Sequence, residues 1–382
     1  LSQSSLSTTR LALHEIVGDL SYGDFEGGLL SLMADNGSVT AGSIAADALT
    51  VAAGSNISLG DLMIGESLAL MAGDAAGVQI TIGDIDYDGP LSFEYSDTSV
   101  SLGDVNTQSL NLALTEGDAS FGSVDADSVD ISAASISSLG SHINAEQIAM
   151  SAGGALALDG SRLAAGSIDL SGDSLGLGET SLATTDLALR QFSGDLAFGD
   201  FEGVALSLTA DGGSISAGNI DADALTVDAA NNLTLGALSI TEALSLTAGD
   251  TAGTQVQIGD IAYGGALDFS YANADVTLGD VSAQALSIEL GNGDAQFGSV
   301  SADSLDVSAI NILSQDSDLV AETIDLLAAN ELTLDTLSIN AGSAALRAGN
   351  TLSLSNSSIT ADQLELRSDE ADVSLASSSL NA

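Results

Sequence analysis

The chain of 382 residues contains no cysteine, no tryptophan and no lysine, and its only proline is Pro90. Without cysteine it can form neither disulfides nor thiolate zinc sites. Aromatic residues make up only 3% of the chain, whereas hydrophobic residues make up 45%, so an ordered core must be built from small and branched aliphatic side chains. No apolar run approaches the roughly 18 residues of a membrane-spanning helix, and we therefore expect no membrane insertion of this segment.

Basic residues are scarcer still than aromatic ones. Five arginines stand against 54 acidic residues, which gives a formal net charge of −49. Binding to phosphate groups needs a basic surface, so nucleic acid is excluded as a partner, and an anionic membrane surface is disfavoured for the same reason. A chain of this charge attracts a dense atmosphere of cations, and we expect divalent cations among its partners.

A long internal duplication is present. The segment "GDLSYGDFEG" at 18–27 returns as "GDLAFGDFEG" at 194–203, and "AADALTV" at 45–51 returns, at the same offset, as "DADALTV" at 221–227. The two copies cover residues 8–183 and 184–367. A repeat of this length has to be interpreted before any local motif, because it determines the architecture.

A shorter period lies within each copy. Triplets of the form apolar–x–apolar begin in equal 19-residue steps at Leu11, Leu30, Leu49 and Leu68, and a longer, 23-residue step leads to Leu91. Alternation with a period of two predicts strands, and a constant return length predicts a solenoid. The fold class is therefore all-β: a right-handed parallel β-helix, or β-solenoid, with three strands per turn of about 19 residues and about 19 turns.

Glycine recurs twelve residues after the start of a triplet. This glycine column predicts a corner at which the backbone adopts positive φ; its members are Gly23, Gly42, Gly103, Gly122, Gly199, Gly218, Gly279 and Gly298. The triplets themselves predict the inward side chains, which include Leu11, Leu13, Leu30, Leu32, Leu206, Leu208, Leu225 and Val227.

The spacing of the triplets is unbroken where the two copies meet, at Ile168, Leu187 and Leu206. We therefore expect residues 1–382 to form a single continuous β-solenoid. Neither end of the sequence carries the polar terminator that a solenoid needs to cover its open strand edges, which predicts an interior segment of a longer protein.

Three segments resemble a known family. "AANNLTLGALSI" at 229–240, "AANELTLDTLSI" at 328–339 and "AGNTLSLSNSSI" at 348–359 are similar to the 19-residue repeats of filamentous-haemagglutinin-like proteins, the large exported adhesins of Gram-negative bacteria. The resemblance implies a right-handed parallel β-helix that is exported by two-partner secretion to the cell surface or the extracellular space. It also implies a role in attachment, aggregation or biofilm cohesion, with other copies of the protein or matrix polysaccharide as partners.

Stacked acids are the best candidates for chemistry. Asp61, Asp84 and Asp104 follow a glycine on three consecutive turns, and Asp260 and Asp280 repeat the arrangement. Such like charges repel one another at the spacing of stacked strands, and a bridging Ca²⁺ with its preference for oxygen ligands would relieve the repulsion. The alternative is a solvated outer face on which the acids provide only solubility.

The segment "DIDYDG" at 84–89 begins like a calcium loop, with Asp84, Asp86 and Asp88 at alternate positions. The twelfth position of the pattern is Tyr95 rather than an acid, so the segment fails as an EF-hand and remains a candidate for a surface Ca²⁺ site only. No cofactor is required by this interpretation, and Ca²⁺ is the one candidate.

Three functions remain open. The first is a structural stalk or filament segment of a secreted adhesin, which is not an enzyme. The second is a polysaccharide-binding or polysaccharide-degrading β-helix protein, although nearly constant turns and the scarcity of basic residues disfavour catalysis. The third is an ice-binding solenoid, which is disfavoured because the outward centres of the triplets, such as Ala12, Ser31 and Thr50, do not form a threonine ladder.

Overall fold

The computed structural model describes residues 6–177 and 180–382, so residues 1–5 and 178–179 of the predicted solenoid lie outside the described part. All regular structure in the described part is β-strand. It therefore contains no helix that is long and apolar enough to cross a membrane. The chain divides into two compact units, Leu1–Phe192 and Ser193–Ala382, which are described separately below.

The strands of the first unit are β1 (Leu6–Glu15), β2 (Leu20–Ser21), β3 (Phe25–Ala34), β4 (Val39–Ala41), β5 (Ile44–Ala53), β6 (Ile57–Leu59), β7 (Leu62–Met71), β8 (Gln79–Ile82), β9 (Ile85–Tyr95), β10 (Ser99–Leu102), β11 (Val105–Leu114), β12 (Ala119–Ser120), β13 (Val124–Asp125), β14 (Ser128–Ala133), β15 (Ile136–Ser137), β16 (His142–Asn144), β17 (Gln147–Ala152), β18 (Ala155–Ala157), β19 (Arg162–Ala164), β20 (Ser167–Gly172), β21 (Ser174–Gly176), β22 (Ser181–Ala183) and β23 (Asp186–Gln191).

The strands of the second unit are β24 (Leu196–Ala197), β25 (Phe201–Ala210), β26 (Ile215–Ala217), β27 (Ile220–Ala229), β28 (Leu233–Leu235), β29 (Leu238–Thr247), β30 (Gln255–Ile258), β31 (Ile261–Tyr263), β32 (Ala266–Tyr271), β33 (Asp275–Leu278), β34 (Val281–Ser282), β35 (Ala285–Leu290), β36 (Ala295–Phe297), β37 (Val300–Ser301), β38 (Ser304–Gln315), β39 (Asp318–Asp335), β40 (Ser338–Ala348), β41 (Thr351–Ser355), β42 (Ser358–Ser368), β43 (Val373–Ala376) and β44 (Ser379–Asn381).

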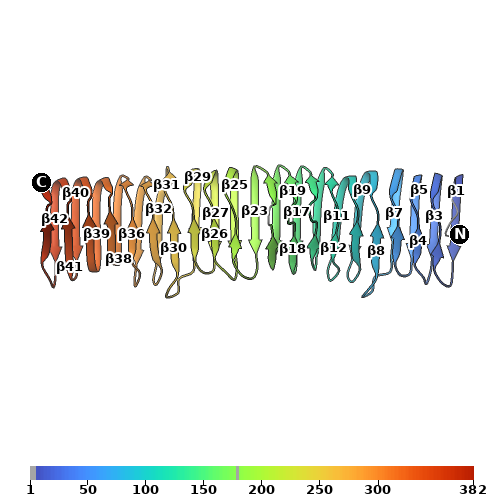
Figure 1. Ribbon diagram of the computed structural model, residues 1–382, viewed down its shortest axis with the longest axis horizontal. Helices are drawn as coiled ribbons and strands as arrows, with labels where there is room; N and C mark the ends of the chain where they lie inside the picture. Colours follow the sequence, from blue (N-terminus) through green and yellow to red (C-terminus); the bar gives the residue numbers. More distant parts are fainter. Residues whose placement is uncertain (1–5, 178–179) are drawn as a thin grey trace. The chain divides into compact units, whose positions relative to one another are not determined.

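Strands stack in parallel, each on the equivalent strand of the next turn (Figure 1). In the first unit Leu30 of β3 pairs with Leu49 of β5, and Leu49 pairs with Leu68 of β7, so equivalent positions of successive turns are about 19 residues apart. The same advance joins Leu206 of β25 to Leu225 of β27 in the second unit. The predicted fold class is confirmed, because the parallel strands form a β-solenoid of about 20 turns.

The longer turn is also where the sequence places it. Leu62 of β7 pairs with Ile85 of β9, and Leu238 of β29 pairs with Ile261 of β31, and each pair is separated by the longer step. The extra residues form the loops before β8 and β30, which extend farther from the strands than their neighbours do (Figure 1). Gly77 and Gly253 adopt positive φ in these loops, at 86° and 91°.

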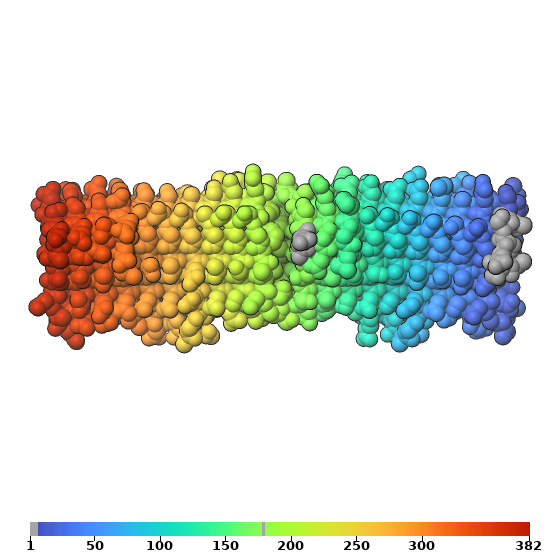
Figure 2. All heavy atoms as spheres, in the orientation of Figure 1, coloured from blue at the N-terminus to red at the C-terminus, as the bar shows by residue number. Residues whose placement is uncertain are grey.

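Alternate side chains of the triplets fill the core of each unit. Leu32, Leu208 and Val227 are completely buried, and Leu30, Leu206 and Leu225 are no more than 2% exposed. Leu11 and Leu13 are half-buried, because β1 is the first strand of the described part. Figure 2 shows the outward side chains packed in bands that follow the turns.

Two of the three strands of a turn are frequently continuous. β3, for example, carries both the buried Phe25 and the triplet of Leu30 in one ten-residue strand, whereas β13 and β14 form the corresponding strands of a later turn separately. The short strands β2, β4, β6, β8, β10, β12, β15, β18 and β21 form the remaining side of the first unit. The side with Phe25 carries the site described next.

The prediction that the glycine column adopts positive φ is wrong. Positive-φ glycines in the described part are Gly18, Gly77, Gly140, Gly160, Gly194 and Gly253, and none belongs to that column. Six members of the column, Gly42, Gly103, Gly122, Gly218, Gly279 and Gly298, are glycine for a steric reason, whereas a methyl group on Gly199 would meet no atom within 4 Å. A methyl group on Gly103 would collide with Asp84 Oδ1 of the preceding turn, and one on Gly279 would collide with Asp260 Oδ1.

Candidate functional site

A row of polar side chains follows the glycine column along the first unit. We call it the ladder row, and its members are Asp24, Ser43, Asp61, Asp84, Asp104, Ser123 and His142. Its aspartates bind the backbone of the following turn: Asp84 N–H donates to Asp61 Oδ1 at 3.1 Å, and Asp104 N–H donates to Asp84 Oδ1 at 2.8 Å. Asp24 and Asp104 accept in the same way from the N–H groups of the serines that follow them in the row.

The glycine column and the ladder row act as one device. The carboxylate of one turn can reach the N–H group of the next only because the intervening residue has no Cβ. The second unit repeats the device, where Asp280 N–H donates to Asp260 Oδ1 at 2.9 Å. Asn219 takes the same role with its amide oxygen, which accepts from Ala237 N–H at 2.9 Å. Each bond satisfies a corner N–H group that no strand partner reaches.

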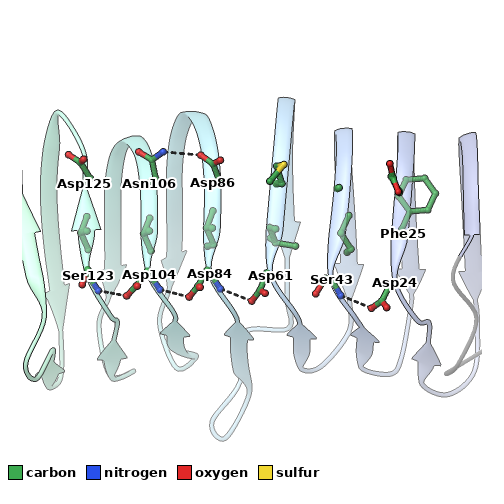
Figure 3. A pocket seen from close by; sticks show the side chains of 18 of the residues that line it. Asp24, Phe25, Ser43, Asp61, Asp84, Asp86, Asp104, Asn106, Ser123 and Asp125 are labelled. Atoms are coloured by element: carbon green, nitrogen blue, oxygen red, sulfur yellow. Dashed lines mark hydrogen bonds between the residues drawn. The ribbon is translucent and has the colours of Figure 1, made fainter.

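A second row projects outward two residues farther along each turn. We call it the rim row, and its members are Glu26, Ala45, Met63, Asp86, Asn106, Asp125 and Asn144. Its amides bind acids rather than backbone, because Asn106 Nδ2 donates to Asp86 Oδ1 at 2.9 Å and Asn144 Nδ2 donates to Asp125 Oδ1 at 3.0 Å. Figure 3 shows the amide nitrogen of Asn106 directed at Asp86 and its oxygen on the opposite side, that of Asp125.

The two rows enclose a groove of about 980 Å³ on the first unit (Figure 3). The strand residues between the rows point their side chains into the core, so mainly their backbone forms the floor; they are Phe25, Ile44, Leu62, Ile85, Val105 and Val124. Seven acids line the groove, namely Asp24, Glu26, Asp61, Asp84, Asp86, Asp104 and Asp125. Its described lining contains His142 and no arginine, so the groove is strongly negative.

The corresponding groove of the second unit is smaller and covers only the turns from Ala237 to Val320. It encloses about 500 Å³, and Asp260, Asp280 and Asp318 are its only acids among the described lining residues. Its rim positions carry small or apolar side chains, namely Ala262, Ser282, Ser301 and Val320. The two copies therefore share the aspartates at Asp84/Asp260 and Asp104/Asp280 of the ladder row and differ at the rim positions of the same turns.

The candidate calcium ligands are divided between these features. Asp61, Asp84 and Asp104 stand in the ladder row of the first unit, Asp260 and Asp280 in that of the second, and Asp86 in the rim row. Across residues 6–177 and 180–382 no three or more His, Asp or Glu side chains are grouped so that they could hold a metal ion. The Ca²⁺ site stays a prediction.

The segment "DIDYDG" begins strand β9 instead of forming a loop. Its side chains alternate, so Ile85 and Tyr87 are buried, whereas Asp84, Asp86 and Asp88 are exposed. Asp88 is not among the residues that line the groove. A strand cannot wrap its three acids around one ion, because successive outward side chains point along a line.

Sequence reasoning missed a pair of loop aspartates. Asp74, in the long loop before β8, accepts from Ser96 N–H at 3.0 Å and from Asp97 N–H at 2.9 Å, and these bonds lower the pKa of its carboxyl group. Asp250 of the second unit accepts from Ala272 N–H and Asn273 N–H in the same way. The 23-residue step marked both loops, but it gave no sign that the loop carboxylate binds the next turn.

Isolated pairs of polar side chains lie on the outer faces. His14 Nε2 lies 2.8 Å from Asp35 Oδ1 in the first unit. In the second unit Arg347 pairs with Asp325 on a neighbouring turn. Burial raises the pKa of Asp306, which lies beside Asp325 in the strand register, and the charge of Asp325 raises it further. These contacts fit outward side chains that pair across turns.

Comparisons with known proteins identify no relative. No protein-family model matches the chain, and the searches of curated proteins and of solved structures found no match either.

Proposed function

We propose that this chain is a structural stalk or filament segment of a large secreted bacterial adhesin, located at the cell surface or outside a Gram-negative cell. Its partners would be other copies of itself or matrix polysaccharide, and it would serve attachment, aggregation or biofilm cohesion. The observation that carries the proposal is the repetition of one turn in both units, with the same register and the same hydrogen bond from an aspartate to the backbone of the next turn. A repeat of this kind adds length without adding a new kind of contact.

The source of each turn's stability agrees with a spacer role. Within each unit a strand stacks on the equivalent strands of its neighbouring turns, and the core consists of aliphatic side chains that alternate with solvated ones. A single turn has too few neighbours to fold alone, so its stability comes from the turns that it stacks on. We further propose that the two copies continue one another as a single solenoid, for which about 19 turns at about 4.8 Å give a length of about 90 Å.

Deletion of one whole copy tests the stalk. Removal of residues 184–359 from the full-length adhesin removes one complete period of the long repeat and preserves the spacing of the triplets. We expect adhesion to persist, with the adhesive end about 40 Å closer to the cell, because each of the nine deleted turns contributes about 4.8 Å. Electron microscopy measures the length and a cell-attachment assay measures adhesion. Loss of adhesion with correct export would contradict a spacer role.

Polysaccharide binding is the second candidate, and the groove of the first unit favours it. A long groove with acceptor groups on both sides can hold an extended polymer. Deletion of residues 8–183 separates the two functions, since this deletion removes the groove whereas deletion of 184–359 does not. Equal effects of the two deletions support the stalk, and loss of binding after the first deletion alone supports the groove.

A further inference from the structure

We propose that the groove of the first unit binds a linear aliphatic polyamine, extended along the stack of turns. The inference rests on the shape, charge and lining of this groove and is independent of the stalk function. It concerns a ligand class, an extended polycation with ammonium groups separated by short methylene chains.

The shape of the groove suits an extended ligand. Its ladder row spans seven successive turns, from Asp24 to His142. Six steps of about 4.8 Å make the groove about 29 Å long. The two rows lie two residues apart on each strand, so the groove between them is only about 7 Å wide. A folded protein surface could not enter so narrow a channel, whereas an unbranched chain could lie in it.

The charge of the groove selects a cation, and its distribution selects an extended one. Seven acids line it. They are spread along the rows, and no three of the described acids are grouped so that they could hold a single metal ion. Charges on a line are matched by a ligand that carries its charges on a line. A second copy of this chain is excluded as the occupant, because it has only five arginines and a net charge of −49.

The rim row places two apolar side chains between its first two acids. Between Glu26 and Asp86 stand Ala45 and Met63, and Met63 is 63% exposed. Exposed Met at this position offers a flexible apolar contact for methylene groups. Ammonium groups would then lie beside Glu26 and Asp86, about 14 Å apart over three turns. A trimethylene or tetramethylene spacer holds neighbouring ammonium groups at separations close to the spacing of turns.

Among the described residues, no side-chain hydrogen-bond donor lies between two neighbouring members of the rim row, Asn106 and Asp125. Asn106 uses its amide nitrogen on Asp86, and its oxygen lies toward Asp125 (Figure 3). Asp125 accepts from Asn144 on its far side. The step from Asn106 to Asp125 therefore presents acceptors from both turns, and an ammonium group can donate to both of them. Charge-assisted bonds of this kind are the strong ones.

Isothermal titration of the 382-residue chain with spermine, at fixed ionic strength, tests the proposal. The variant Asp86→Asn with Asp125→Asn removes two rim charges and keeps an oxygen that can accept from Asn106 and Asn144. The control Asp130→Asn with Asp169→Asn removes two charges from exposed positions outside the groove. We expect the rim variant to weaken spermine binding about tenfold or more, as loss of one or two charge-assisted bonds predicts, and the control to weaken it less than about twofold.

Methionine methyl resonances locate the ligand without a variant. Spermine should shift the methyl signal of Met63 and leave that of Met71 unchanged, because Met71 is 57% exposed but lies outside the groove. Equal weakening by the two charge variants, or an unshifted Met63 signal at saturation, would overturn the proposal in favour of a diffuse cation atmosphere. Equal affinity for Mg²⁺, or tighter binding of an oligolysine peptide than of spermine, would overturn the choice of ligand.

Discussion

The two copies of the duplication keep more of the ladder row than of the rim row: four of seven ladder positions carry the same residue, but only one of seven rim positions does. In the ladder row Asp84 and Asp104 recur as Asp260 and Asp280, and in both copies the carboxylates accept hydrogen bonds from the backbone of the next turn. In the rim row Asp86 and Asp125 of the first copy correspond to Ala262 and Ser301 of the second. A side chain that satisfies a neighbouring backbone group is costlier to replace than one that binds only another side chain. Asp61 is the exception, since the second copy carries Ala237 at its position.

A second difference lies at a corner with left-handed backbone. Gly140 and Gly160 adopt positive φ in the first copy, at 65° and 71°. The equivalent residues of the second copy are Asp316 and Thr336, with φ of 49° and 55°. The backbone path is thus retained where glycine has been replaced. At these positions the second copy carries strain that the first avoids, and most of it falls on the β-branched Thr336.

The largest effect is expected in the core that both copies share. Leu208→Asp and the equivalent Leu32→Asp should each lower the free energy of unfolding by at least about 4 kcal/mol, because each buries an unpaired charge among aliphatic side chains. Ser207→Asp, one residue away and half-buried, should change it by less than about 0.5 kcal/mol. Urea denaturation followed by circular dichroism measures both. Equal shifts for Leu208→Asp and Ser207→Asp would show that the assigned inward side chains are wrong.

The shared ladder row can be broken at its glycine. Gly279→Ala should lower the free energy of unfolding by about 2–3 kcal/mol, because the new methyl group collides with Asp260 Oδ1 and displaces the bond to Asp280 N–H. Gly264→Ala is the matched control, since nothing lies within 4 Å of its added methyl group and the first copy carries Asp88 there. A neutral result for Gly279→Ala in urea denaturation would refute the steric role of the column.

The residues at the left-handed corner can be exchanged between the copies by substitution. Thr336→Gly should raise the free energy of unfolding by about 0.5–1 kcal/mol, since relief of the strain exceeds the entropic cost of glycine. Gly160→Thr should lower it by about 1–2 kcal/mol, although its added atoms meet no close neighbour. Asp316→Gly should gain less than Thr336→Gly, because Asp tolerates this conformation better than a β-branched residue does. Destabilisation by Thr336→Gly would be the contrary result.

The calcium prediction is tested most directly in the ladder row. CaCl₂ should raise the melting temperature more than NaCl of equal ionic strength, and Asp84→Asn with Asp104→Asn should remove this gain. Asparagine keeps the acceptor for the backbone N–H group, as Asn219 does in the second copy, so the variant removes charge without breaking the ladder. Equal stabilisation by the two salts would leave the acids as a solvated face.

The smallest effect concerns acid sensitivity at Asp74. Its folded pKa is lowered by the N–H groups of Asp97 and Ser96. Such a carboxylate stabilises the fold fully above its unfolded pKa of about 3.9, and this contribution disappears as the pH falls through the folded pKa. Asp74→Asn should therefore lower the melting temperature slightly at pH 7 and leave it unchanged near pH 2. A constant difference between the variant and the natural chain over this range would contradict the assignment.

The structural reason for the glycine column could not be derived from the sequence. A glycine at a fixed phase is compatible with a positive φ and with close approach of another turn, and only the register of stacked strands distinguishes the two. The contact that decides it joins residues of successive turns, such as Gly103 and Asp84. The groove depends on the same register, because it forms only where outward residues of consecutive turns align.

What the sequence by itself determined was the strand class, the 19-residue step, the 23-residue turn and the inward side chains, because each of these follows from the spacing of apolar residues along the chain. What only the tertiary structure decided was which polar atoms meet. Asp61, Asp84 and Asp104 bind the backbone, Asp86 binds Asn106, and the space between their rows is a groove. Hydrogen bonds and steric contacts extend over a few ångströms, so they depend on how turns stack, whereas burial depends mainly on the pattern within each strand.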